Sequence, residues 1–213
     1  MEIITLTDDY AGMNTYVVRE GDHCFFIDPI RSDELRKAAD HCTADFAILT
    51  HEHYDHIRGV NGIREQYPGL QILCGRHAEK GLADESVNMS KYMVYLLTVI
   101  PFGNGKAEEN CHYTCSADRT CGDEEIIPWE GHQLYIRETP GHSAGSISIL
   151  ADGQFLFSGD VIFKDYPTAT RLPGGNAKDW NEITKPWLEG LPQDIMVYPG
   201  HTEPFLLKQR YQK

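Results

Sequence analysis

One short segment of the sequence is crowded with possible metal ligands, His51-Glu52-His53-Tyr54-Asp55-His56. Imidazole nitrogen and carboxylate oxygen are the ligands that a borderline divalent cation such as zinc prefers. His51, His53 and Asp55 alternate along the chain, so an extended backbone would direct all three to one side. His56 would then point elsewhere and could serve a second ion. Residue type and spacing together predict a metal site.

Three further candidate ligands, His142, Asp160 and His201, occur in one shared local context. Each follows an apolar or alternating segment typical of a strand and then a turn that contains Gly or Pro. The segment before His51 has the same apolar character. In chain order the four segments are 46–50, 134–139, 155–159 and 195–198. Four strand ends that each deliver a ligand predict a site at one edge of a pair of sheets, where a rigid scaffold positions it.

Composition limits the class of protein. The chain has 213 residues, 41% hydrophobic and 24% charged, which predicts a single globular domain over residues 1–213. The net charge of −13 disfavours nucleic-acid binding, which depends on Lys and Arg. The longest apolar run, 92–102, is too short to span a bilayer, and the N-terminus lacks a basic signal-peptide region. We therefore expect a cytoplasmic enzyme with a small-molecule substrate and no nucleic-acid or membrane partner; the oligomeric state stays open.

The order of expected elements indicates the architecture. Strands are expected at 3–6, 14–18, 24–27 and 70–74, and again from 124 through 149. Helices are expected from Ser32, as N-cap, to Ala39, and at 59–66, 85–98 and 180–188. The stretch 101–125 combines glycines, acidic residues and three cysteines, and predicts an inserted loop. Strand-rich blocks that are each followed by helices favour an α/β (α+β) fold with two sheets between helical layers.

The six cysteines are expected to be free thiols, because no secretory signal is evident. Cys111, Cys115 and Cys121 lie close together in the sequence and could form a small second metal site or a redox pair. Their irregular spacing favours a loop that merely contains cysteines.

Four motifs together give the chain a family resemblance. They are His51–His56, Thr139-Pro140-Gly141-His142-Ser143-Ala144-Gly145-Ser146, Phe157-Ser158-Gly159-Asp160 and Tyr198-Pro199-Gly200-His201. In order and spacing the sequence resembles the metallo-β-lactamase-fold hydrolases. It looks most like the short type II glyoxalases, or hydroxyacylglutathione hydrolases. Asn14-Thr15-Tyr16, Phe163-Lys164 and Leu172-Pro173-Gly174-Gly175 support this closer match.

The resemblance implies a four-layer αββα sandwich with a dinuclear metal site at the sheet edge. Two divalent ions are implied, with zinc expected and iron or manganese as alternatives. His51, His53 and His142 would hold the first ion, Asp55, His56 and His201 the second, and Asp160 would bridge both. The implied reaction is hydrolysis of a thioester by a metal-bridging hydroxide that attacks the acyl carbonyl. Asp55 would act as the catalytic residue that orients this nucleophile.

The sequence departs from the short type II glyoxalases in one segment expected to bind substrate. Short glyoxalases carry a Gly-Arg or Gly-Lys pair where this chain has Thr168-Ala169, so glutathione is not fixed as the thiol carrier. Lys164, Tyr166 and Arg171 are the remaining candidates for substrate binding.

Several other activities stay open on the same ligands. A lactonase or a phosphodiesterase could use them, and so could an enzyme like the persulfide dioxygenases, which hold one iron. Phe163 weakens the lactonase alternative, because those enzymes have a Tyr at that place. A bridging Asp160 disfavours a β-lactamase. Thr50, Ser143 and Thr202 are candidates for orienting the imidazoles through their hydroxyl groups.

Overall fold

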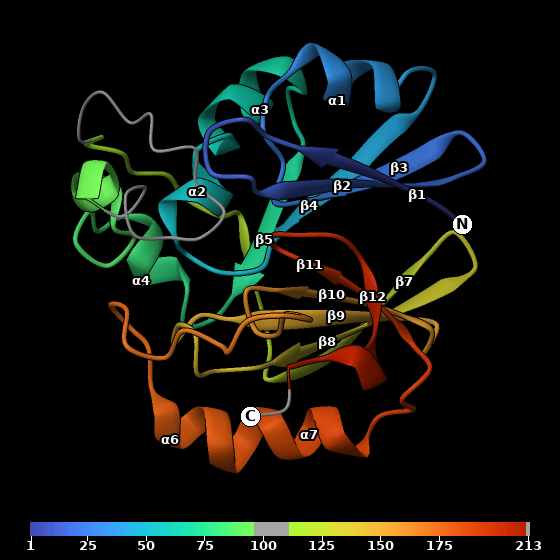
Figure 1. Ribbon diagram of the computed structural model, residues 1–213. Helices are drawn as coiled ribbons and strands as arrows, with labels where there is room; N and C mark the ends of the chain where they lie inside the picture. The colour runs from blue at the N-terminus through green and yellow to red at the C-terminus, as the bar shows by residue number, and fades with distance from the viewer. Residues whose placement is uncertain (96–110, 212–213) are drawn as a thin grey trace.

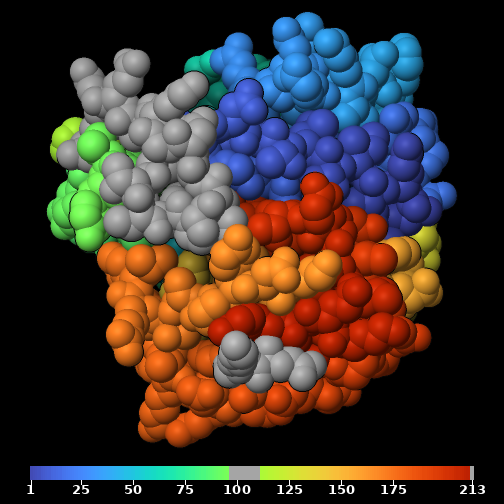
Figure 2. Space-filling view, in the orientation of Figure 1, coloured from blue at the N-terminus to red at the C-terminus, as the bar shows by residue number. Residues whose placement is uncertain are grey.

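The computed structural model describes residues 1–95 and 111–211 of the chain. Two sheets of six strands each pack face to face, and helices cover both outer faces (Figure 1). The expected helix–sheet–sheet–helix layering and the α/β fold class are confirmed. In Figure 2 the N-terminal residues, in blue, and the C-terminal residues, in orange and red, form two stacked blocks of the surface.

The first sheet contains its strands in sequential order. They are β1 (Glu2–Thr7), β2 (Asn14–Glu20), β3 (His23–Ile27), β4 (Thr43–Leu49), β5 (Gln71–Gly75) and β6 (Arg119–Cys121). The pairs β1–β2 and β2–β3 are antiparallel, whereas β3, β4, β5 and β6 run parallel to one another. The carboxyl ends of these four strands therefore lie at one edge of the sheet.

The second sheet is built from the C-terminal half. Its order is β12 (Phe205–Leu206), β11 (Met196–Pro199), β10 (Phe155–Gly159), β9 (Ile147–Ala151), β8 (His132–Glu138) and β7 (Glu124–Trp129). β10 and β11 are parallel, and β9 is antiparallel to both β10 and β8. Consequently β8, β10 and β11 all point the same way and end at the same edge.

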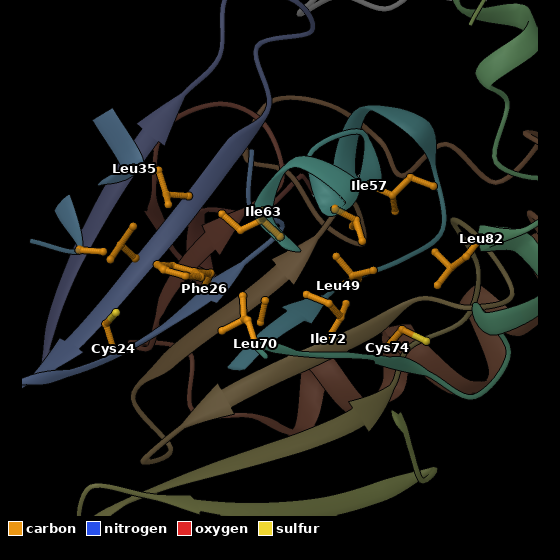
Figure 3. Packing of buried hydrophobic residues seen from close by; sticks show 14 of the residues in the cluster. Cys24, Phe26, Leu35, Leu49, Ile57, Ile63, Leu70, Ile72, Cys74 and Leu82 are labelled. Atoms are coloured by element: carbon orange, nitrogen blue, oxygen red, sulfur yellow. The ribbon is translucent and has the colours of Figure 1, made fainter. Parts of the chain in front are cut away.

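Side chains alternate between the two faces of each strand, so the first sheet contributes to a core between the sheets and to a core beneath the outer helices. Val18, Phe25 and Ile48 are buried between the sheets, and their sequence neighbours face the outer helices. Figure 3 shows the outer layer, where Phe26 and Leu49 of the sheet meet Leu35, Ile57 and Ile63. Each such side chain contributes about 1.5–3 kcal/mol by leaving water.

Helices complete the outer layers. α1 (Asp33–Ala38) and α3 (Val60–Gln66) cover the first sheet, and Ser32 Oγ accepts from Leu35 N at 3.0 Å, as expected of an N-cap. One continuous helical segment covers the second sheet. It consists of α6 (Ala177–Asp179), the π-helical turn η2 (Trp180–Thr184) and α7 (Lys185–Gly190). Within the described part of the chain, no helix has the length and apolarity needed to cross a membrane.

Short elements are where the structure adds to the sequence-based prediction. These are α2 (Tyr54–Ile57), α4 (Glu79–Leu82), η1 (Ser90–Tyr92) and η3 (Leu207–Gln209). A helical segment was expected within 85–98. Residues 85–88 form turns and a bend, 90–92 form η1, 93–95 are helical, and 96–98 lie outside the described residues. Within the expected loop at 101–125, residues 101–110 also lie outside, and Arg119–Cys121 form β6 by pairing with β5. Three or four residues are too few to show a period, so tertiary pairing decides their structure.

Candidate metal centre

The seven predicted ligands come from strand ends at one edge of the two sheets. His51 follows β4, His142 follows β8, Asp160 follows β10 directly, and His201 follows β11. Their backbones are also tied together, because Gly200 N donates to Gly159 O at 2.8 Å. The shared strand direction therefore delivers ligands from both sheets to the same place.

The local backbone of the His51–His56 motif differs from the expectation. An extended backbone was expected to direct His51, His53 and Asp55 to one side. The structure keeps the chain extended only as far as His53, and α2 then begins at Tyr54. The prediction was wrong for Asp55, because Asp55 and His56 lie in the short helix α2 and are not placed by strand alternation. The helical turn still brings both side chains to the same centre.

The ligand atoms of these residues converge closely. Three groups each have their ligand atoms within 4.8 Å of one another: His51, His53 and His142; His51, His56 and Asp160; and Asp55, His56 and His201. Asp160 lies between the groups. Its Oδ1 is 3.4 Å from His56 Nε2, and its Oδ2 is 3.5 Å from His201 Nε2 and 3.7 Å from His142 Nε2. All seven predicted ligands are thus brought together.

The outward nitrogen of each imidazole faces an acceptor. His53 Nε2 lies 3.4 Å from Pro173 O, His142 Nδ1 3.0 Å from Ala169 O, and His201 Nδ1 3.1 Å from Gly12 O. Because a carbonyl can only accept, the proton of a neutral imidazole sits on that outward nitrogen. The inward nitrogen keeps its lone pair, which is the state that a metal ligand needs.

Asp28 performs the same task for the other two histidines. Its Oδ2 accepts from His56 Nδ1 at 2.8 Å and from Thr50 Oγ1 at 2.7 Å. Because Thr50 Oγ1 donates its single proton to Asp28, it accepts from His51 Nδ1 at 3.0 Å. Thr50 thus contacts a ligand imidazole through its hydroxyl group, the contact that its expected orienting role requires. Asp28 itself is 1% exposed and was not predicted from the sequence.

The centre fits a cation by two independent observations. First, His51 Nε2, His56 Nε2 and Asp160 Oδ1 are buried, and each lacks a hydrogen-bond partner within the described structure. Buried polar atoms without partners are costly, and a bound cation would satisfy these. Second, a Cβ placed on Gly200 would collide with Asp160 Oδ1 and His56 Cε1. Glycine at this position leaves space for the carboxylate.

Burial and charge set the protonation states of the centre. Burial and neighbouring imidazoles lower the pKa of His51, and burial lowers the pKa of His142 to about 4. Burial also opposes a charge on His56, but Asp160, Asp55 and Asp28 outweigh it and raise its pKa. Burial would raise the pKa of Asp160, yet the imidazoles of His201 and His56 hold it well below its usual range. Without a cation, the three carboxylates therefore favour a protonated His56, and a divalent cation would have to displace that proton, because it requires neutral imidazoles and ionised carboxylates.

The three residues predicted to bind substrate are exposed, and one of them lines a cavity. Lys164 and Arg171 are exposed, whereas Tyr166 lines a cavity of about 330 Å³ together with Trp180 and Lys185. None of the seven ligands lines that cavity. At the place of the missing basic pair, Thr168 Oγ1 donates to Val161 O at 2.6 Å, and Ala169 offers its carbonyl to His142.

Among the described residues, the cysteines belong to no group of metal-ligating side chains. None of the six is part of a disulfide, as expected. Cys121 is buried between the sheets, whereas Cys115 packs against the outer core of the first sheet. Among the residues that the structure describes, the groups of metal-ligating side chains all belong to the centre at the strand ends.

Sequence reasoning missed two carboxylates beside the centre, Asp28 and Glu52. Asp28 follows the apolar strand β3 and precedes Pro29, which is the context that identified the other ligands, so a signal was present. Glu52 lies inside the motif but is directed to Ser143, whose Oγ donates to Glu52 Oε2 at 2.8 Å. Ser143 thus contacts Glu52 rather than an imidazole. Thr202 contributes its backbone carbonyl, which accepts from Asn14 Nδ2 at 2.7 Å.

Comparison with known families gives one extended match. Residues 12–201 match the model of the Metallo-beta-lactamase superfamily. Among curated relatives, a "Probable metallo-hydrolase YqgX" of Bacillus subtilis is 28% identical over 194 residues, which cover 88% of this chain and 84% of the relative. A "Hydroxyacylglutathione hydrolase" of Aeromonas salmonicida is 25% identical over 197 residues. The match covers 92% of this chain, and the chain spans 61% of that relative's length.

Solved structures show the same fold. The BLEG-1 B3 metallo-beta-lactamase superposes with a TM-score of 0.77 at 25% identity, over 98% of this chain and 95% of that chain. TTHA1623 in a di-iron-bound form gives 0.70 at 22% identity, over 98% and 96%. ETHE1 from Myxococcus xanthus gives 0.71 at 21% identity, over 98% and 81%. The latter two likenesses concern the fold alone.

Proposed function

The chain belongs to the metallo-beta-lactamase superfamily, and we propose that it is a metal-dependent hydrolase that cleaves thioesters with two divalent cations. The observation that carries this proposal is the convergence of five imidazoles and two carboxylates in three overlapping groups, with the Asp160 carboxylate close to His56, His142 and His201. A single ion would leave part of this ligand set unused. A relative in fold, TTHA1623, is described in a di-iron-bound form, which supports the count of two.

In this proposal each ligand group has its own task. When bound, two divalent cations would polarise an acyl carbonyl and activate a water molecule near neutral pH. His51, His53 and His142 would hold one ion. Asp55, His56 and His201 would hold the other, with the Asp160 carboxylate shared between the two groups. Asp55 would also accept a hydrogen bond from the attacking water and so orient it toward the carbonyl.

The leaving group favours a thioester. Because the pKa of a thiol is only about 8.5, a thiolate departs with little need for a proton donor. Glu52, the remaining carboxyl group of the motif, is directed to the hydroxyl group of Ser143 and not into the centre. An amide would need a proton donor at its departing nitrogen, and a thioester does not. The similarity to hydroxyacylglutathione hydrolases points to the same class of substrate.

The identity of the thiol carrier depends on residues 164–171. The Thr168 hydroxyl group donates to the Val161 carbonyl, and the Ala169 carbonyl faces His142. Neither residue has the basic side chain that the short glyoxalases carry at this place. Lys164 and Arg171 are the exposed cations of this segment. We propose that they contact the carrier weakly, and that the enzyme accepts carriers other than glutathione.

A β-lactam hydrolase is the second candidate, because the BLEG-1 B3 metallo-beta-lactamase has this fold and is 25% identical. A lactone, a phosphodiester or a persulfide remains a further alternative on the same ligands. The metal content separates the persulfide alternative, which would use one iron.

The test combines metal stoichiometry with turnover. Protein purified without chelator is analysed for bound metals and assayed with S-lactoylglutathione, with an acyl thioester of coenzyme A and with a chromogenic β-lactam. We expect two divalent ions for each chain and turnover of at least one thioester. Asp160→Ala should lose both metal and turnover, because the carboxylate shared by the two groups is removed. Two ions with β-lactam turnover alone would replace the proposal, and a single iron would favour the dioxygenase.

A further inference from the structure

Glu52 is a buried carboxylate that the proposed reaction does not use. It stands between the ligands His51 and His53 and is 1% exposed. Its Oε2 accepts from Ser143 Oγ at 2.8 Å, and Ser143 directly follows the ligand His142 in the chain. A buried carboxylate is retained at such a place only if its partners compensate for lost solvation.

Glycines surround this side chain on three sides. A Cβ at Gly145 would overlap Glu52 Oε2, and a Cβ at Gly81 would come within 2.6 Å of Glu52 Cγ. A Cβ at Gly174 would lie 3.4 Å from Oε1. These glycines belong to the 142–146 loop, to α4 and to the turn that presents Pro173 O to His53. Glu52 therefore packs against the loop that carries His142, against α4 and against the turn that follows Pro173.

A short chain of hydrogen bonds connects Glu52 to the loop that carries His142. Ser143 Oγ donates to Glu52, so it accepts from Ser146 Oγ, which lies 3.0 Å away. Ser146 Oγ in turn accepts from Ser143 N at 3.2 Å. Every proton of this chain has an acceptor, and the chain ends on the carboxylate. The loop conformation that directs His142 inward is thus fixed by Glu52.

The two sides of the centre differ in the carboxylate behind them. Asp28 lies directly behind His56 and, through Thr50, behind His51. The His142 side has no such direct contact, since the outward nitrogens of His53 and His142 face carbonyl groups. Burial raises the pKa of Glu52, whereas the hydrogen bond from Ser143 and the cations that the centre would hold favour its ionised form. In that form Glu52 supplies negative charge on this side, at one remove through Ser143. Negative charge close to a cation site raises its affinity for the cation.

We propose that Glu52 is a positioning residue that sets the cation affinity of the group formed by His51, His53 and His142. It acts by fixing the 142–146 loop and by adding negative charge behind it. This inference rests on the metal-binding part of the proposed function and does not depend on which substrate is cleaved.

The test measures cation binding directly. Metal-stripped protein is titrated with Co²⁺ alone, and the visible absorption of bound Co²⁺ reports the ligand geometry of each binding step. His142→Ala identifies the step that belongs to the His51, His53 and His142 group. For Glu52→Gln we expect that step to weaken by about 10–100-fold and to change its absorption, with the other step unchanged. Glu79→Gln removes a similar charge from the exposed surface of α4 and should change neither step.

A second variant keeps the test decisive if Glu52→Gln folds poorly. Ser143→Ala removes only the hydroxyl link and should weaken the same step by a smaller factor, and Ser143→Thr should restore it. Unchanged binding in both Glu52→Gln and Ser143→Ala overturns the inference. So does equal weakening of both steps together with a lower Tm, because that is a general loss of structure. Wild-type protein that binds two Co²⁺ but cleaves no thioester would refute the proposed substrate and leave this inference standing.

Discussion

The molecule has two clusters of histidine and carboxylate side chains, one at each end of the same strands. β4 begins near Asp45 and leads into His51, and β8 begins at His132 and leads toward His142. In Figure 1 α2, which contains Asp55 and His56, lies on the left, and β7, which ends at Trp129, lies on the right near the N-terminus. The residue types are the same at both ends, but their chemistry differs.

At the right-hand end each imidazole faces a carboxylate near the surface. His23 Nδ1 lies 3.0 Å from both Oδ atoms of Asp45, and Trp129 Nε1 donates to Asp45 Oδ2 at 2.8 Å. His132 Nδ1 lies 2.6 Å from Asp152 Oδ2, and its Nε2 lies 3.2 Å from Glu20 Oε2. Of these contacts, Trp129–Asp45 and His132–Glu20 connect the first sheet to the second. The hydrogen bond to Asp45 raises the pKa of His23, and the one to Asp152 raises that of His132.

At the metal end the imidazoles turn their inward nitrogens toward one another. His142 Nε2 lies 2.9 Å from His53 Nδ1, and burial lowers the pKa of both residues. Such an arrangement is unfavourable without a cation, whereas the right-hand cluster is satisfied by its own ion pairs. Burial and the identity of the group that faces the inward nitrogen decide whether a histidine serves as a ligand or as half of an ion pair.

The largest effect that separates the two ends is expected from Trp129→Ala. Trp129 is 5% exposed, packs edge to face against Phe25 at 4.7 Å between ring centroids, and donates to Asp45. Its truncation should lower the free energy of unfolding by about 3–5 kcal/mol, measured by urea denaturation. Co²⁺ affinity should stay unchanged, because none of the seven ligands contacts this cluster. Trp187→Ala, which removes a half-buried Trp from α7, is the matched control and should cost less. A parallel fall in Co²⁺ affinity would show that the ends are coupled.

A smaller effect, confined to the metal end, is expected from Asp28→Asn. The variant keeps the shape of the side chain but replaces one acceptor oxygen of the carboxylate with an amide donor. His56 Nδ1 and Thr50 Oγ1 both use Oδ2, and Thr50 N donates to Oδ1. Whichever oxygen the amide nitrogen replaces, it faces a group that can only donate to that position. Metal affinity in chelator competition should fall by about 10–100-fold. The matched substitution Asp45→Asn removes a carboxylate that also faces an imidazole, at the other end, and should leave metal affinity intact. Equal losses in both variants would contradict the comparison.

The metal end was largely predictable from the sequence, and the right-hand end was not. Each ligand follows a strand-like run, and strand direction then carries the side chains to one edge, so local patterns reveal the site. His23 and His132 have no such pattern. His23 meets Asp45 through the pairing of β3 with β4, His132 meets Asp152 beside the pairing of β8 with β9, and His132 meets Glu20 because the two sheets stack. Pairing and stacking are long-range consequences that no local period encodes. The same reason explains why Glu52 and the strand β6 were missed, since packing and pairing define both.

The smallest effect expected is a dependence of stability on pH at the right-hand end. The carboxylates of Asp152 and Glu20 raise the pKa of His132 in the folded chain above its usual value. The charged imidazole therefore stabilises the fold fully below about pH 6.5, and this contribution is lost as the pH rises through the folded-state pKa. His132→Gln removes the contribution. The difference in unfolding free energy between the wild type and this variant should be largest at about pH 5.5 and should shrink by about pH 8.5.

The control for this prediction is His41→Gln, since the side chain of His41 is 91% exposed. It should show no comparable change with pH. All three proteins are measured without metal. The titration of the metal ligands then contributes equally to each unfolding free energy and cancels in the differences. A difference that grows with rising pH would mean that His132 is preferred in its neutral form. The pairs at that end would then resemble the buried imidazoles of the metal centre, and the contrast between the two clusters would fail.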